Sequence, residues 1–191
     1  MSIKYPNPSK NTNEKISLDS HLKSKGMAFE NALNISNQYY LTKGIANIHK
    51  KPTPINIVKV DYPKRSSSKI VEAYYQTPST TDYNGIYRGK YIDYEAKETS
   101  GTSFSFTHIF KHQVEHLINI RKLGGIGFVI IYFKKYSEVY IFDIDVFEEL
   151  YYSGNKKSIN QADANKYGLK VNLGYTPPID YLKSVDKLID K

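Results

Sequence analysis

The chain has 191 residues, of which 40% are hydrophobic and 24% charged, which excludes a disordered or fibrous protein and predicts one globular domain. It contains no cysteine and no apolar run long enough to span a bilayer, so we expect a cytoplasmic protein without disulfides, thiolate metal sites or cysteine nucleophiles. The excess of 27 Lys and Arg over 19 Asp and Glu favours a polyanionic partner such as nucleic acid.

The first third of the chain predicts an arm, a helix, a strand and a basic segment. Residues 1–25 contain five lysines and two prolines but no apolar period, which predicts a flexible basic arm before a single domain over 26–191. Apolar side chains recur at helical spacing from Met27 to Leu41, and a short strand is predicted at 45–49. Three prolines between 50 and 65 then argue against a central strand.

The elements that follow predict a mixed sheet flanked by helices. Residues 66–75 favour either a short helix or the return limb of a protruding hairpin, and residues 80–98 predict a hairpin with Arg88-Gly89 as its turn. The later elements are a helix at 107–123 capped by Thr107 and ended by Gly124-Gly125, strands at 128–133 (central) and 138–142, and helices at 145–152 and 179–189.

The predicted hairpin brings two acidic side chains close together. With Arg88-Gly89 as a two-residue turn, Asp82 lies opposite Glu95 and Thr80 lies opposite Lys97. Opposed residues share a face with their Cβ atoms roughly 5 Å apart. Two carboxylates this close repel each other unless a cation separates them, so the hairpin predicts a site for a hard divalent ion such as Mg²⁺.

Alternation along the second limb of this hairpin sorts its side chains by face. Asp93, Glu95 and Lys97 share one face, whereas Ile92, Tyr94 and Ala96 point to the other. Two readings without a metal stay open. One is an exposed hairpin with surface ion pairs, and the other is a different register, with a turn at Asn84-Gly85 or a bulge at Gly85.

Longer blocks of sequence carry a resemblance to a known family. Asp82 followed after twelve residues by Glu95-Ala96-Lys97 resembles the D…ExK nuclease motif, and from about Gly26 onward the chain resembles the RecU-type Holliday junction resolvases. The matching blocks are IANIHKKPTP (45–54), VDYPKRS (60–66), EAYYQTPSTTDYNGIYRGKYIDYEAKET (72–99), HQVEH (112–116) and YTPPIDYLK (175–183). This resemblance implies an α/β fold, a restriction-endonuclease-like mixed sheet flanked by helices, with a protruding stalk at about 56–76.

The resemblance also implies an activity and partners. It implies an endonuclease that resolves four-way DNA junctions by paired symmetric nicks in recombination and repair, with products that have 5′-phosphate ends. A two-fold homodimer suits a junction in which two strands are nicked. A RecA-type recombinase and a branch-migration helicase are further partners that the family implies.

The resemblance assigns roles to individual side chains. Asp82, Glu95 and Lys97 are the implied catalytic residues, and Lys97 stabilises the transition state. The implied ligands of Mg²⁺, or of Mn²⁺ as a substitute, are Thr80, Asp82, Glu95 and Gln113. Gln113 shares a helical stripe with Phe110, Leu117 and Ile120, so it points towards the sheet. Asp93 has no family role, and we expect it to be a solvated neighbour.

The basic segment predicts contacts with DNA. Between Lys43 and Lys69 there are seven Lys or Arg and one acid, which describes either a solvated charged loop or, beside a nuclease motif, a phosphate-binding surface. The resemblance implies Lys50, Lys51 and Arg65 as DNA contacts, and we expect Tyr74 or Tyr75 to stack on exposed bases, because stacking tolerates any sequence. The full set of expected DNA contacts is Lys50, Lys51, Lys64, Arg65 and Tyr75.

Two other functions compete with the nuclease. His112-Gln-Val-Glu115-His116 matches the H-x-x-E-H pattern of inverted zinc proteases, in which two histidines hold zinc and the glutamate acts as base. A third zinc ligand would have to come from Glu138, Glu148 or Glu149. The other alternative is an architectural protein that binds junctions without cutting them, which the intact Asp82, Glu95 and Lys97 argue against.

Replacing Arg65 is expected to weaken junction binding. Arg65→Ala removes a cation from the predicted phosphate-binding segment, which should lower affinity and reduce the salt dependence of binding by about one unit of slope. Affinity for a synthetic four-way junction, titrated at several salt concentrations, measures both effects. The same affinity for both proteins across the series would refute the assignment.

Overall fold

The computed structural model describes residues 29–61, 68–75 and 80–190. The predicted basic arm over 1–25, together with Lys64 and Arg65, lies outside the described residues. Within the described ranges, no helix has the length and apolarity needed to cross a membrane.

A six-stranded mixed sheet forms the centre of the fold, in the order β1-β4-β5-β7-β8-β10. Strands β5 and β7 pair in parallel, and every other neighbouring pair in this sheet is antiparallel. The apolar run predicted to be a central strand is β7, which lies between β5 and β8. The strands are β1 (Ala46–Lys50), β4 (Tyr83–Tyr87), β5 (Lys90–Thr99), β7 (Ile126–Phe133), β8 (Glu138–Asp143) and β10 (Leu169–Lys170).

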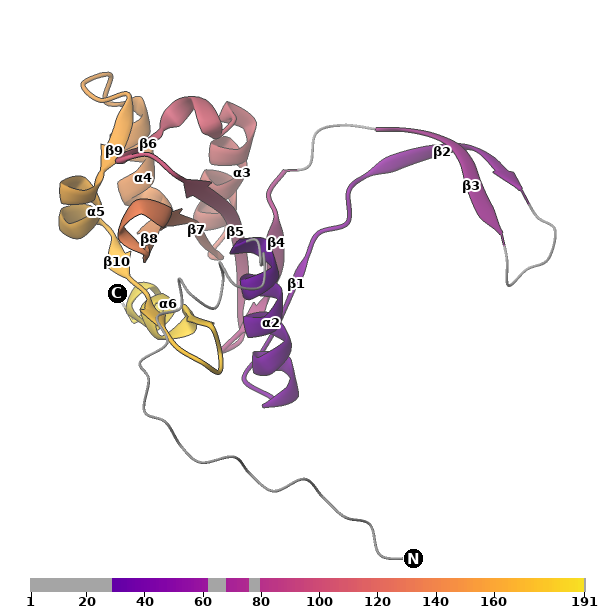
Figure 1. Cartoon of the computed structure of the whole chain (residues 1–191), viewed down its shortest axis with the longest axis horizontal. Helices are drawn as coiled ribbons and strands as arrows, with labels where there is room; N and C mark the ends of the chain where they lie inside the picture. Colours follow the sequence, from indigo (N-terminus) through magenta and orange to yellow (C-terminus); the bar gives the residue numbers. More distant parts are fainter. Residues whose placement is uncertain (1–28, 62–67, 76–79, 191) are drawn as a thin grey trace, which may run out of the picture.

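Helices cover both faces of this sheet (Figure 1). On one face, α2 (Phe29–Thr42) and α6 (Leu182–Ile189) pack in the same core as Tyr94. On the other face, α3 (Lys111–Lys122) and α4 (Ile144–Tyr152) pack in the same core as Val129. The expected mixed sheet flanked by helices is confirmed.

Several short elements complete the body and had no counterpart in the sequence predictions. Each of the short strands has only two or three residues, too few to show a period. They are β6 (Ser103–Ser105) paired with β9 (Ser158–Asn160), β11 (Asn172–Leu173) paired with β12 (Ile179–Asp180), the helix α5 (Gln161–Tyr167), and the 3-10 turns η2 (Phe106–His108) and η3 (Lys134–Tyr136).

The turn between β4 and β5 fixes the register on which the predicted site depends. Arg88 and Gly89 have φ angles of 50° and 72°, both positive, as a two-residue type I′ turn requires. Tyr83 pairs with Tyr94 and Gly85 pairs with Ile92, so the predicted register is confirmed, and neither the Asn84-Gly85 turn nor a bulge at Gly85 occurs.

A stack of aromatic rings reinforces this register across three strands. The ring of Tyr94 on β5 stacks against Tyr83 of β4 on one side and Phe128 of β7 on the other, with centroids 4.8 Å apart in both pairs. All three side chains are completely buried. A slip of β5 would break both ring contacts and expose apolar surface, so the stack opposes slippage.

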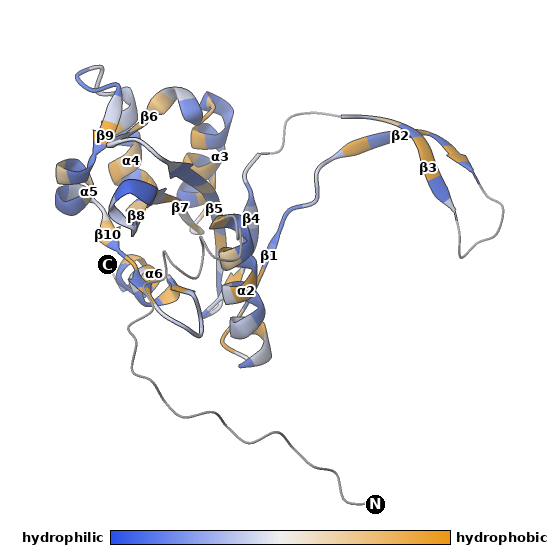
Figure 2. Cartoon of the chain, viewed as in Figure 1, coloured by the Kyte–Doolittle hydropathy of each residue, from blue (hydrophilic) through white to orange (hydrophobic). Residues whose placement is uncertain are grey.

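The expected stalk is a two-stranded hairpin that projects from the body (Figure 1). It consists of β2 (Ile55–Asp61) and β3 (Lys69–Tyr75), so the second segment is the return limb of a hairpin and not a helix. Its strands carry hydrophobic residues, which are orange in Figure 2, and of these Ile57, Val58, Ile70 and Val71 are each 52–59% exposed. The stalk therefore has no core of its own.

Two predicted helix starts are wrong. Ser105 caps η2 by accepting a hydrogen bond from the Thr107 N–H, and Ile109 is then extended, so α3 begins at Lys111 and Thr107 is not its N-cap. The final helix begins at Leu182, because Ile179 and Asp180 pair with β11.

The predicted end of α3 at Gly124-Gly125 is confirmed. Gly124 has a φ of 89°, its N–H donates to the Arg121 carbonyl and the Gly125 N–H donates to the Ile120 carbonyl, which is the Schellman arrangement.

Gly85 is expected to be indispensable for the β1–β4 pairing. A Cβ atom at this position would lie 2.0 Å from the Asn47 carbonyl oxygen and 2.5 Å from the Ile48 Cα, and backbone atoms cannot move aside without separating the strands. Gly85→Ala should lower the free energy of unfolding by more than about 2 kcal/mol. Urea denaturation measures this, with Gly101→Ala as control, since the nearest atom there would be 3.6 Å away. Equal losses in both variants would contradict the steric argument.

Candidate active site

One face of β5 carries polar side chains into the interface with α3. Asp93 and Glu95 are both completely buried, and Lys97 follows them on the same face with 22% of its side chain exposed. The alternation predicted for this strand is confirmed, because Ile92 and Tyr94 belong to the core on the other face. Buried carboxylates are rare unless their charge is compensated, so the partners of each acid decide its role.

Glu95 is only partly compensated. Its Oε1 accepts a hydrogen bond of 2.8 Å from Gln113 Nε2 and lies 2.5 Å from Lys97 Nζ. Its Oε2 is buried and has no hydrogen-bond partner among the residues that the structure describes. A buried carboxylate oxygen without a donor is unfavourable, and a bound cation would satisfy it.

Asp82 lies beside Glu95 and is held by backbone N–H groups of β5 and of the residue that follows β1. Its Oδ2 accepts a hydrogen bond of 3.0 Å from the Ala96 N–H, and its carbonyl oxygen accepts one of 2.8 Å from the Lys51 N–H. The predicted apposition of the two acids is therefore present.

The pKa of the Glu95 carboxyl is raised from 4.5 to about 7, mainly by burial and then by the negative charge of Asp82. The charge and hydrogen bond of Lys97 oppose this shift. The three implied catalytic side chains thus act on one another directly. The ionised form of Glu95 is therefore disfavoured, and a nearby positive charge would stabilise it.

The side-chain oxygens of Gln113 and Thr80 already accept hydrogen bonds from other residues. Gln113 is buried, and its Oε1 accepts from the Phe110 N–H while its Nε2 donates to Glu95. The predicted direction of Gln113 towards the sheet is confirmed, although Phe110, assigned to the same stripe, is 63% exposed. The Thr80 hydroxyl accepts a hydrogen bond of 3.2 Å from Lys51 Nζ.

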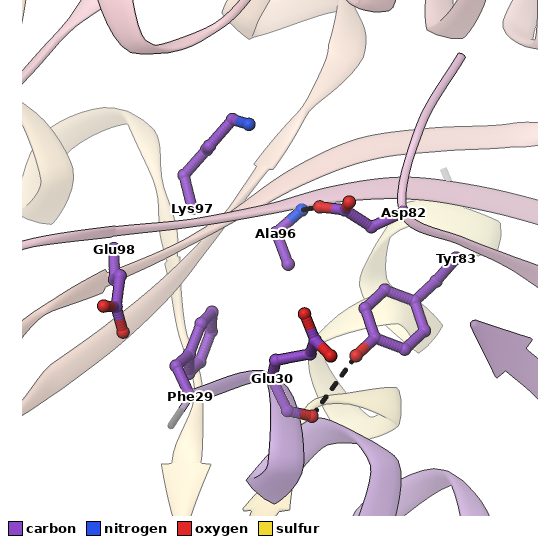
Figure 3. Close-up of a pocket in the computed structure, with 7 residues that line it drawn as sticks. All are labelled: Phe29, Glu30, Asp82, Tyr83, Ala96, Lys97 and Glu98. Carbon is purple, nitrogen blue, oxygen red and sulfur yellow. Dashed lines mark hydrogen bonds between the residues drawn. The ribbon is translucent and has the colours of Figure 1, made fainter. Parts of the chain in front are cut away.

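A cavity of about 210 Å³ opens beside Asp82 (Figure 3). Glu30 of α2 reaches into it, while Lys97 extends from β5 away from Glu30. Glu30 is also ion-paired with Lys50, whose Nζ lies 2.6 Å from Glu30 Oε1. The lining residues are Phe29, Glu30, Asp82, Tyr83, Ala96, Lys97 and Glu98.

Asp93 is not the solvated neighbour that we expected from the sequence. It is completely buried and accepts hydrogen bonds from Lys51 Nζ (2.8 Å), Tyr91 Oη (3.0 Å) and Thr81 Oγ1, and its Oδ2 lies 3.0 Å from His116 Nε2. Burial alone would raise the pKa of Asp93, but its bonds with His116, Lys51 and Thr81 outweigh burial and hold the pKa below its usual value. Alternation placed Asp93 on the correct face, but nothing in the sequence indicated that α3 covers it.

The residues expected to contact DNA differ in accessibility. Tyr75 is 82% exposed on the stalk, and the Lys50 side chain is 42% exposed at its base. The Lys51 side chain is only 15% exposed, and its ammonium group is engaged by Asp93. Lys51 is therefore oriented towards the interior of the site.

The histidines of the H-x-x-E-H pattern have other partners. His112 stacks on Phe110, Glu115 pairs with Lys111 at 3.0 Å and His116 bonds Asp93. In the part of the chain that the structure describes, no three His, Cys, Asp or Glu side chains are grouped to hold a metal ion. The third zinc ligand that a protease requires is therefore not brought to these histidines.

Comparisons with known proteins place the chain among recombination nucleases. The family model described as Recombination protein U matches residues 24–187. The Holliday junction resolvase RecU of Geobacillus sp. (strain WCH70) is 50% identical over 169 residues, which cover 86% of this chain and 84% of that protein. The RecU of Pediococcus pentosaceus is 46% identical over 199 residues, covering 100% of this chain and 99% of the relative.

A solved structure is also similar. Hjc, a Holliday junction resolvase from Archaeoglobus fulgidus, is 15% identical with a TM-score of 0.45, covering 74% of this chain and 93% of that one.

The metal-free protein is expected to lose stability as the pH rises from about 5 to 8. The unfolded chain releases the Glu95 proton near pH 4.5, whereas the fold retains it up to about pH 7. The folded state binds more protons in this interval, so the free energy of unfolding falls as pH rises, by on the order of 3 kcal/mol from this group.

Urea denaturation in EDTA at pH 5 and pH 8 measures this loss. Glu95→Gln keeps the shape of the side chain but cannot titrate, so its stability should fall less over the same interval. The same fall in both proteins would contradict the assignment to Glu95.

Proposed function

The chain belongs to the Recombination protein U family, and from this premise we propose that it is a Mg²⁺-dependent endonuclease that resolves four-way (Holliday) DNA junctions. We propose that it acts as a homodimer and makes paired symmetric nicks during recombination and repair. The observation that carries the proposal is the buried Glu95 carboxylate, with one unpartnered oxygen, beside Asp82 and Lys97.

The residues of the site fit a hard divalent cation. Mg²⁺ is usually held by one or two carboxylates and keeps several waters, which matches the pair Asp82 and Glu95, and Mn²⁺ is a suitable substitute. We propose Thr80 and Gln113 as further members of the ligand shell, since Gln113 donates a hydrogen bond to Glu95 and Thr80 lies two residues before Asp82. When bound, the ion would supply Lewis acidity at the scissile phosphate and lower the pKa of a water molecule.

Lys97 supplies positive charge at the reacting phosphate. Its ammonium is fixed 2.5 Å from Glu95 Oε1, yet part of the side chain remains open to solvent and so to a substrate. Negative charge that develops at phosphorus during in-line attack is stabilised by a cation already in place, because no reorganisation is then needed. A water oxygen forms a bond to phosphorus as the P–O3′ bond breaks, so one strand end keeps a 3′-hydroxyl and the other keeps the phosphate as the 5′-phosphate end that we propose.

The stalk and its base present the proposed DNA contacts. Lys50 and Tyr75 are exposed on described parts of this region, and we propose that Lys64 and Arg65 add phosphate contacts. An exposed tyrosine can stack on an unpaired base of any sequence, which suits a junction centre. Lys51, first expected to contact DNA, has its ammonium bound to Asp93, so we propose a different role for it below.

A homodimer would present one such site to each of two strands of the junction. We also propose a cytoplasmic location, and a RecA-type recombinase and a branch-migration helicase as partners.

Cleavage of a synthetic junction tests the proposed function. With Mg²⁺, the wild-type protein should convert a labelled four-way junction into nicked duplexes that ligase can seal. Asp82→Asn removes one carboxylate of the pair and should reduce the rate at least about 100-fold. Asp145→Asn is the matched control, because Asp145 is an exposed acid paired with Arg121 on the surface, and it should retain the wild-type rate.

The outcomes separate the alternatives. Junction binding by the wild type without cleavage would favour an architectural protein. Equal rates for the wild type and Asp82→Asn would contradict the proposed site.

A further inference from the structure

Asp93 is where three parts of the molecule are tied together. It lies on β5 two residues before Glu95 and on the same face, and its bonding partners come from separate segments. Lys51 follows β1 at the start of the connection to the stalk, Thr81 precedes β4, and His116 lies on α3. A single carboxylate therefore joins the base of the stalk, the segment 80–82 and α3.

Lys51 extends this connection to two proposed metal ligands. Its Nζ donates to Asp93 Oδ2 at 2.8 Å and to Thr80 Oγ1 at 3.2 Å, and its backbone N–H donates to the Asp82 carbonyl oxygen at 2.8 Å. The same Nζ lies 2.5 Å from Thr81 Oγ1. One residue thus holds three consecutive residues of the site, and its ammonium is neutralised by Asp93.

His116 extends the connection to α3. It lies three residues after Gln113, so both side chains project from the same side of the helix. His116 Nε2 is 3.0 Å from Asp93, and Gln113 Nε2 is 2.8 Å from Glu95. The helix is therefore attached to β5 at two successive acids of one face, and sliding of α3 would break both attachments.

Asp93 is unsuited to bind a metal itself. Its Oδ1 accepts from Thr81, and its Oδ2 is contacted by Lys51, Tyr91 and His116, so its oxygens are already used. No part of its side chain is exposed to solvent.

We propose that Asp93 is a positioning residue, which sets the geometry of the metal site by fixing the Thr80–Asp82 segment through Lys51 and α3 through His116. This inference rests on the proposed function. Groups that orient metal ligands without touching the metal contribute about 10- to 100-fold to metal affinity. The same network fastens the base of the stalk at Lys51, so the DNA-binding element and the metal ligands share one anchor.

Binding of Mn²⁺ to the full-length protein without DNA tests the inference. Asp93→Asn keeps the size of the side chain but removes the charge that holds Lys51, and it should bind Mn²⁺ about 10- to 100-fold more weakly by calorimetry. The electron paramagnetic resonance spectrum of bound Mn²⁺ should change as well, which a loss of overall stability alone would not produce.

Asp163→Asn is the matched control. Asp163 is also a largely buried acid with a lysine partner, Lys156, but it completes the capping box of α5 by accepting from the Asn160 N–H, and within the described residues its bonds do not reach the proposed site. This variant should be less stable and should bind Mn²⁺ with the wild-type affinity and spectrum.

A double variant covers the case in which Asp93→Asn fails to fold because Lys51 is left without its counter-ion. Lys51→Met with Asp93→Asn removes both charges, and it should fold yet still bind Mn²⁺ about 10- to 100-fold more weakly. Wild-type Mn²⁺ affinity and spectrum in either folded variant would overturn the inference alone. Absence of Mn²⁺ binding by the wild type would overturn the proposed metal dependence, and this inference with it.

Discussion

Two carboxylates on one face of β5 are both removed from water, and the site depends on how differently they are compensated. Asp93 is contacted by four side chains and its pKa is lowered, so it is a stable anion within the protein. Glu95 has two partners on one oxygen and none on the other, and its pKa is raised to about 7. Removing an anion from water is costly unless positive charge or donors replace the solvent. Asp93 is therefore stable without a further partner, whereas the ionised form of Glu95 would be stabilised by a bound cation.

This arrangement exists only because the register of the β4–β5 hairpin is correct. The alternation of β5 would present the same acids in any register, but only one register places Asp82 beside Glu95. Two independent features select it, namely the positive φ angles at the turn and the ring stack centred on Tyr94. The ring stack lies on the face of β5 opposite to the acids, so packing on one face of the sheet fixes the site on the other.

Local features of the sequence predicted local features of the structure. The Arg88-Gly89 turn, the register and the end of α3 at Gly124 depend on nearby residues and are confirmed. The start of α3 was missed because the cap at Ser105 stabilises a separate 3-10 turn first. The burial of Asp93 and the role of Lys51 could not be predicted, since these residues meet across 42 positions of sequence and beneath a helix packed by tertiary contacts. The resemblance to a family supplied the activity, which neither composition nor periodicity contains.

The exposed apolar surface of the β2–β3 hairpin has a consequence for the thermodynamics of binding. An isolated two-stranded hairpin is marginally stable in water, and Ile57, Val58, Ile70 and Val71 gain nothing from packing while they face solvent. Contacts with a bound partner must then supply part of the free energy that stabilises this hairpin. The hairpin should therefore become more ordered when the partner binds. Association through this element should carry a negative heat-capacity change, because apolar area leaves water only in the complex.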